Sequence, residues 1–195
     1  MSEPIRLAID RAMVVFGGGQ GLMPELAADA VLARARSGEI QAAVPRLLEL
    51  MTDDQLGDVE PWTIARLFED QSWRQWSDEQ RECVEAVLDA WWSTLLVLYP
   101  FEPGVDDVLA TLAVFGLPLV RWLLPLLESL DGSGTLHVRD IVLGGLPGPG
   151  WREHQAARLE ILGWCRSEPV VMGLAVVGGV HLAPGELGLL LDELL

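Results

Sequence analysis

A twelve-residue stretch that ends at Asp140 places oxygen-bearing side chains at the spacing of a calcium-binding EF-hand loop. Asp131 stands at the third position, Ser133 at the fifth and Asp140 at the twelfth. Ser129 replaces the usual first acid, and Asp140 replaces the longer glutamate that binds calcium through both oxygens. The pattern predicts a weak calcium site at Asp131, Ser133 and Asp140. The alternative is an ordinary turn in which Ser133 or Thr135 caps the next helix.

No other pattern indicates catalysis or a bound cofactor. The three histidines lack the spacing of a closed metal site, and the glycines at 17–21 match neither a dinucleotide-binding nor a P-loop motif. Cys83 falls inside an expected helix, where a cysteine usually packs as a small apolar residue. We therefore expect a protein that is not an enzyme and has no cofactor. An enzyme with a dispersed site is the less favoured alternative.

Tryptophan and acidic residues form the strongest candidate binding surface. Trp73, Arg74 and Trp76 precede Asp78 and Glu79, and Trp and Arg are common anchors of protein interfaces. These five residues predict a contact site for a partner protein. The competing interpretations are that both tryptophans fill the core and that the acidic residues only form a solvated helix face.

The elements that must position these residues are helices. Residues 78–98 carry apolar side chains at steps of three and four, which places them on one helix face. Ser77 and Gln80 are spaced as a capping box at the start of this helix. We expect further helices at 4–16, 24–36, 40–51, 61–71, 105–115, 118–130, 136–143, 151–166, 169–177 and 184–194.

This pattern predicts an all-α fold of antiparallel helical hairpins, stacked as a short HEAT-like α-solenoid. The pairs would begin at residues 24, 61, 105, 136 and 169, at intervals typical of helical repeats. Pro45 and Pro125 each fall inside the second helix of a pair, which is a weak internal echo. The alternative is a globular helical bundle in which the two prolines coincide by chance.

The domain organisation follows from the turn-forming residues. Residues 1–23 should form an N-terminal helix and a glycine-rich joint, and residues 24–195 the helical repeat domain. The Gly- and Pro-rich run at 144–150 forbids a continuous helix and marks a possible hinge.

The net charge limits the classes of partner that the protein can bind. The chain has 195 residues, with 13 Arg, no Lys and 29 acidic residues, which gives a net charge of −16. Such a charge disfavours nucleic acid and anionic lipid and favours a basic protein partner. The absence of both Lys and Asn is typical of a GC-rich bacterial genome. Two cysteines are too few for a disulfide framework, and no segment has the pattern of a signal peptide or a membrane span, so we expect a soluble cytoplasmic protein.

Three segments resemble a known family. They are the run at 44–50, the Trp73-x-x-Trp76 turn and the run at 87–91. Together they are similar to a family of uncharacterised bacterial helical proteins with a Leu-Pro-Arg-x-Leu-Glu-Leu helix, a Trp-x-x-Trp-Pro turn and a helix ending in Leu-x-Ala-Leu-Trp. This chain differs at Val44, Ser77 and Trp92. The resemblance covers about residues 26–130 and implies a HEAT-like fold, but no catalytic residues.

The sequence therefore favours a protein-protein interaction or scaffold module that binds a partner through an acidic, Trp-containing surface. Its alternative is a small-molecule or weak calcium-binding regulatory protein.

Overall fold

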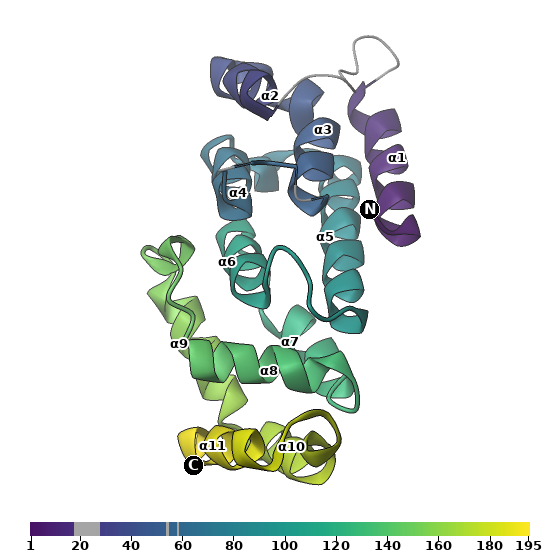
Figure 1. Cartoon of the computed structure of the whole chain (residues 1–195). Helices are drawn as coiled ribbons and strands as arrows, with labels where there is room; N and C mark the ends of the chain where they lie inside the picture. Colours follow the sequence, from purple (N-terminus) through teal and green to yellow (C-terminus); the bar gives the residue numbers. More distant parts are fainter. Residues whose placement is uncertain (18–27, 54, 58) are drawn as a thin grey trace. The chain divides into compact units, whose positions relative to one another are not determined.

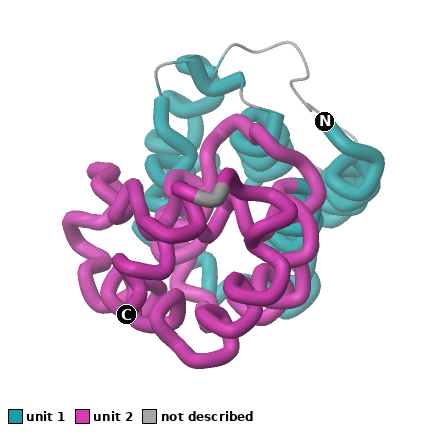
Figure 2. The backbone as a smooth tube through the Cα atoms, turned by 60° about the horizontal axis from the view of Figure 1, so that its bottom comes forward, with its two compact units in different colours: residues 1–94 teal, residues 95–195 magenta. Residues whose placement is uncertain are grey.

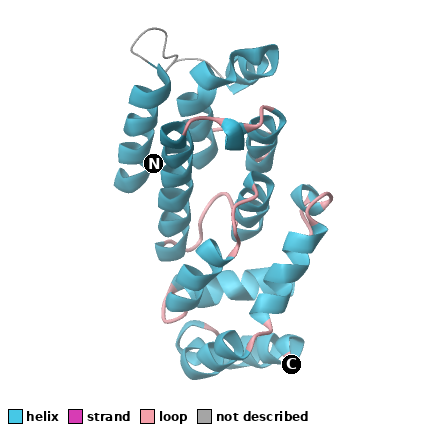
Figure 3. Cartoon of the chain, turned by 180° about the vertical axis from the view of Figure 1, so that it is seen from behind, coloured by secondary structure: helices cyan, strands magenta, loops and turns pink. Residues whose placement is uncertain are grey.

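The structure is a computed structural model of the chain, and it describes residues 1–17, 28–53, 55–57 and 59–195. All the regular elements in these ranges are helices, without a strand among them (Figures 1 and 3), which confirms the all-α fold class. The chain divides into two compact units, unit 1 at Met1–Thr94 and unit 2 at Leu95–Leu195 (Figure 2).

Unit 1 is built from sequential helices that pack around α3. Its elements are α1 (Glu3–Gly17), α2 (Ala28–Arg34), the π-helical turn η1 (Ala35–Glu39), α3 (Ile40–Thr52), α4 (Pro61–Asp70), the 3-10 turn η2 (Trp73–Gln75) and α5 (Asp78–Val97), whose last turn belongs to unit 2. Helix α3 contacts α1, α2 and α4. Of the predicted glycine joint at 17–21, only Gly17 lies within the described residues, and it ends α1.

The apolar face predicted for α5 is buried throughout. Its side chains are 0–8% exposed at Val84, Val87, Leu88, Trp91, Trp92, Leu95 and Leu96. Burying this much apolar surface is the main favourable contribution to folding. Trp91 and Trp92 therefore belong to the core.

The N-terminus of α5 is closed by the predicted capping box. The backbone N–H of Gln80 donates to Ser77 Oγ at 3.3 Å, and the backbone N–H of Ser77 donates to Gln80 Oε1 at 3.2 Å. These two bonds satisfy donors that the helix itself leaves without partners. The capping box thus fixes where the turn that carries Trp73 and Trp76 passes into α5.

Unit 2 continues from the last turn of α5 and is organised around α8. Its further elements are α6 (Val105–Phe115), α7 (Val120–Glu128), α8 (Ser133–Gly144), the 3-10 turn η3 (Pro149–Trp151), α9 (Gln155–Cys165), α10 (Glu168–His181) and α11 (Pro184–Leu194). Helix α8 contacts α6, α7, α9, α10 and α11, and α10 also contacts α7. The Gly- and Pro-rich run at 144–150 interrupts the helices between α8 and α9, as expected.

Pro45 and Pro125 lie inside helices, as predicted: Pro45 in α3 and Pro125 in α7. Pro45 is buried among apolar side chains of unit 1, and Pro125 is half-buried in unit 2.

Among the described residues, no single helix has the length and apolar character needed to cross a membrane. Helices α9 and α10 meet that criterion only when taken together, and they are bent by 53° at the break between them.

Candidate functional site

The predicted partner-binding residues lie at the turn between α4 and α5 in unit 1. Trp73 and Arg74 belong to η2, Trp76 ends that turn, and Asp78 and Glu79 form the first turn of α5. The structure thus keeps all five on one continuous segment, as their closeness in sequence requires.

The two tryptophans of this turn have different environments. Trp73 is only 2% exposed, so the core-packing interpretation holds for it and it does not project as an anchor. Trp76 is half-buried. Its ring lies 5.6 Å from that of Phe68 on α4 and 5.6 Å, edge to face, from that of Phe16 on α1. These aromatic contacts hold the turn against two helices of unit 1.

Exposed carboxylates both precede and follow this turn in the sequence. The exposed acids are Glu69, Asp70, Asp78, Glu79 and Glu82. Two of them lie near arginines: Asp78 pairs with Arg81, and Glu82 lies 3.7 Å from Arg11. Asp78 remains 86% exposed and Glu82 68% exposed, so water screens both pairs strongly and leaves the acidic surface accessible.

A hollow of about 190 Å³ opens at the centre of this surface. Glu69, at the end of α4, lines it together with Ser72, Trp73, Arg74 and Gln75. Ser72 has a left-handed backbone with φ of 53°, which turns the chain sharply between α4 and η2. The hollow combines one carboxylate, one guanidinium and the edge of a buried indole, so it suits a single projecting side chain better than a whole small molecule.

The predicted calcium loop does not form. Helix α8 begins at Ser133, so the last eight of the twelve loop positions are helical. Seven helical steps separate Ser133 from Asp140, a rise of roughly 10 Å, which is too far for both to bind one ion. Asp140 accepts hydrogen bonds from Arg139 at 2.7 Å and from the Tyr99 hydroxyl at 3.0 Å. Asp131 is exposed, and its backbone carbonyl accepts a bond from His181 at 2.7 Å.

The alternative prediction for this segment, a serine or threonine cap, is also wrong. Ser133 Oγ donates to the carbonyl of Leu96, and Thr135 Oγ donates to the carbonyl of Leu130. Neither hydroxyl accepts from the first turn of α8, and Gly132 occupies the cap position. Both hydroxyls therefore act as donors to carbonyls and leave the first turn of α8 without a side-chain cap. The described residues contain no group of three or more His, Cys, Asp or Glu side chains arranged to hold a metal ion.

His137, Cys83 and Cys165 are buried, and their surroundings are those of packed core residues. His137 Nε2 lies 2.9 Å from the carbonyl of Leu95 and 3.1 Å from that of Leu98, at the end of α5, and burial lowers the pKa of His137. Burial raises the pKa of Cys83, and it raises the pKa of Cys165 to about 12. Both thiols are therefore protonated near neutral pH and poor nucleophiles.

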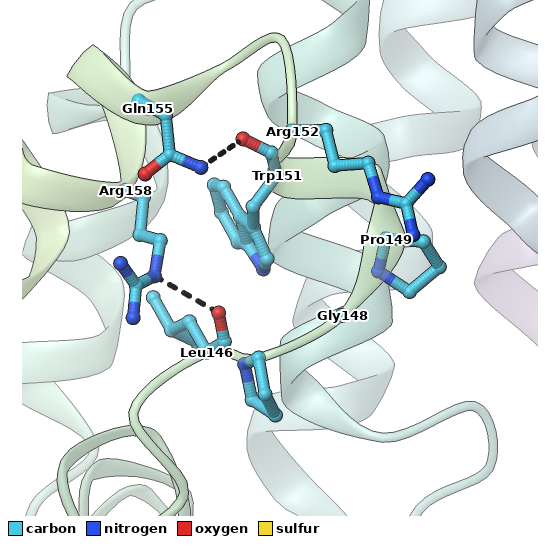
Figure 4. Close-up of a pocket in the computed structure, with 8 residues that line it drawn as sticks. Leu146, Gly148, Pro149, Trp151, Arg152, Gln155 and Arg158 are labelled. Carbon is cyan, nitrogen blue, oxygen red and sulfur yellow. Dashed lines mark hydrogen bonds between the residues drawn. The ribbon is translucent and has the colours of Figure 1, made fainter.

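A second hollow, which sequence reasoning did not find, lies in unit 2 between the 146–152 loop and the start of α9 (Figure 4). Its volume is about 480 Å³. We call it the Arg152 pocket and define it by the residues that line it: Leu146, Pro147, Gly148, Pro149, Trp151, Arg152, Gln155 and Arg158.

Asp106 braces the loop of this pocket from α6. One carboxylate oxygen accepts from the indole Nε1 of Trp151, and the other accepts from the backbone N–H of Gly148 at 3.3 Å. Trp151 itself is 1% exposed. The loop is therefore fixed at two points, and the acid that fixes it is not among the lining residues.

Arg158 fixes the same loop from α9. Its Nε donates to the carbonyl of Leu146 at 2.9 Å, and its Nη2 donates to the carbonyl of Gly145 at 2.5 Å (Figure 4 shows the first bond). Leu146 is fully buried and has a left-handed backbone, with φ of 52°. A non-glycine residue in this conformation is strained and needs surrounding structure to hold it.

A sequence signal for this pocket did exist. The Gly- and Pro-rich run at 144–150 leads directly into Trp151 and Arg152, and Arg158 follows within two helical turns. The loop that carries these residues is held by Asp106, which is distant in sequence, and no local pattern indicates that contact.

Comparisons with protein-family models, with curated proteins and with solved structures find no match to this chain.

Proposed function

We propose that this protein is a non-catalytic interaction module that binds a basic partner protein through the η2 surface of unit 1. We define the η2 surface as Glu69, Asp70, Arg74, Trp76, Asp78, Glu79 and Glu82. The observation that carries this proposal is the hollow beside η2, which is lined by the Glu69 carboxylate and has four further exposed acids along the surrounding chain.

Surface charge gives this site its selectivity. Exposed carboxylates accelerate association with a basic protein and disfavour acidic competitors. Most of these side chains lie in water, so each contributes modestly to affinity, and the attraction weakens with added salt.

The hollow supplies the anchor that the acidic surface lacks. A partner Lys or Arg entering it would meet the Glu69 carboxylate, with its aliphatic stem against Trp73, and the exposed Arg74 side chain that also lines the hollow would turn toward solvent. Buried contacts of this kind carry most of the binding energy in protein interfaces. Trp76 would contribute the exposed part of its ring at the rim. Trp73 acts here as a wall of the hollow and as core, in place of a projecting anchor.

The test begins with capture of the partner from a lysate of the cells that make this protein, followed by purification of that partner. Its affinity is then measured for Glu69→Gln and for the control Glu193→Gln, which neutralises an exposed acid on α11. We expect about tenfold weaker binding for the first variant and no change for the second. Equal affinities would contradict the role of the hollow.

We also propose that the helical hairpins are HEAT-like repeats and that the protein works in the bacterial cytoplasm, as a member of the family that its sequence resembles. The support is the packing of sequential helices within each unit and the recurrence of a proline inside α3 and α7. An experimental structure in which successive hairpins repeat by one constant rotation would support the array, and irregular relations between hairpins would contradict it.

A further inference from the structure

We propose that the Arg152 pocket of unit 2 binds a small organic molecule through a single carboxylate group. This proposal concerns a different unit from the η2 surface and does not depend on the partner-binding function.

Charge distribution is the first argument. Unit 2 contains twelve acidic residues and only five arginines, yet two of those arginines line this pocket and none of the acids does. Three other hollows contrast with it. Glu69 lines the hollow at η2, Glu128 and Asp131 line a groove between α7 and α10, and Glu160 lines a hollow near α7 and α9. The Arg152 pocket is therefore a cationic site within an acidic unit.

Available hydrogen-bond donors are the second argument. Arg152 is exposed, and its guanidinium makes no hydrogen bond or ion pair to any residue that the structure describes, while its backbone N–H donates to the carbonyl of Pro149 at 3.2 Å. Arg158 uses Nε and Nη2 to hold the loop, and its Nη1 donates to none of the described residues. Gln155 Nε2 donates to the Trp151 carbonyl at 2.7 Å, which orients this amide at the mouth of the pocket. The guanidinium of Arg152 can thus bind a planar carboxylate through two parallel bonds.

The rigid loop is the third argument. Asp106 on α6 and Arg158 on α9 both bond to the loop. These hydrogen bonds stabilise the loop in which Leu146 has its strained, left-handed backbone. Strained residues of this kind concentrate at ligand sites, where a fixed geometry lowers the entropy lost on binding. Arg158 is accordingly a positioning residue, and Arg152 is the residue that binds the ligand.

Size and wall chemistry indicate the rest of the ligand. A volume of about 480 Å³ lies within the usual range for small-molecule pockets. Pro147 and Pro149 are exposed and give the pocket an apolar wall. One guanidinium with a single open edge balances one negative charge, so a monoanion such as an aromatic carboxylate fits better than a phosphate dianion.

The experiment is a titration of the full-length protein with benzoate, followed by ligand-observed NMR at low ionic strength. Benzamide and phenyl phosphate serve as probes of the same ring without a carboxylate. We expect benzoate to bind with a Kd in the millimolar range, and both other probes to bind at least about fivefold more weakly. Arg152→Ala should weaken benzoate binding about tenfold. Because Arg152 is exposed, this variant should remain folded.

Arg166→Ala is the matched control, since it removes an exposed arginine from the same unit outside the pocket. It should change the benzoate Kd less than about twofold. Equal losses in the two arginine variants, or no benzoate binding at about 10 mM, would overturn the site. Phenyl phosphate binding as tightly as benzoate would overturn the carboxylate assignment.

Discussion

Gly134 shows at the scale of one residue how closely unit 2 is packed at the start of α8. A Cβ atom added at Gly134 would lie 2.6 Å from the backbone carbonyl oxygen of Ser129. Gly134 also donates its backbone N–H to that same oxygen at 3.1 Å. Because the obstacle is backbone, no side-chain rotation can relieve it.

Gly134→Ala should therefore destabilise the protein by about 1–3 kcal/mol, as overpacking does elsewhere. Gly163→Ala is its control, because nothing lies within 4 Å of a Cβ at that exposed position of α9. The control should stabilise by roughly 0.5–1 kcal/mol through helix propensity. Chemical denaturation of both variants measures the difference, and a Gly134→Ala protein as stable as the wild type would contradict the packing.

His137 should make stability depend on pH. Burial lowers the pKa of His137 in the folded protein, while the unfolded chain titrates near 6.5. As the pH falls through 6.5, the unfolded state takes up a proton that the folded state refuses, so the free energy of unfolding decreases. This contribution is complete above pH 6.5 and is lost toward the lower folded pKa.

His137→Gln keeps a donor for the carbonyls of Leu95 and Leu98 but cannot titrate. The free energies of unfolding of wild type and His137→Gln, measured from pH 7.5 to about pH 5, should converge as the pH falls. Carboxylates shared by both proteins cancel in this difference. A constant difference would show that His137 does not titrate differently on folding.

At the scale of elements, the capping box of α5 gives a local prediction. Ser77→Ala removes the oxygen that accepts from the Gln80 backbone and should cost about 1 kcal/mol. Ser93→Ala makes the same chemical change at an exposed interior position of the same helix. It should be neutral or stabilise by a few tenths of a kcal/mol. Thermal unfolding measures the stability of both variants. Equal changes in stability would show that the Ser77 cap does not stabilise α5.

Helix boundaries were predictable where local chemistry decides them. The predicted helix at 105–115 has the same bounds as α6, because Gly104 precedes it and Gly116 ends it with a left-handed φ of 67°. Helix α10 was predicted to stop at Val177, before two glycines, yet it continues to His181. Gly178 is buried there against Leu187 of α11, so contact between helices overrides the local breaking signal.

The candidate sites were predictable only in part, for the same reason. The η2 surface follows one continuous segment, so its residues could be grouped from sequence. The burial of Trp73 and the Arg152 pocket depend on contacts between segments far apart in the chain. The calcium motif failed because Ser133 bonds to the carbonyl of Leu96, outside the loop, and because α8 already begins at Ser133.

At the scale of the whole molecule, negative charge extends over the entire chain. Unit 1 contains 17 acidic residues and eight arginines, and unit 2 contains twelve and five. General electrostatic attraction would therefore act on a basic partner wherever it approached. A specific site must bind the partner more tightly than the rest of the acidic surface does. The proposed function therefore requires a larger loss of affinity when charges of the η2 surface are removed than when charges elsewhere are removed.

The most direct test compares two double variants, each of which changes one Asp and the Glu that follows it in the sequence. Asp78→Asn/Glu79→Gln removes two of the five negative charges of the η2 surface, and Asp192→Asn/Glu193→Gln neutralises an exposed pair on α11 with the same change in net charge. The measurement is the affinity of the captured, purified partner for each variant at low and high salt. The proposed function predicts weakening of about fivefold or more for the first variant alone at low salt, and a smaller difference at high salt. Equal weakening in both variants, or none in either, would contradict it.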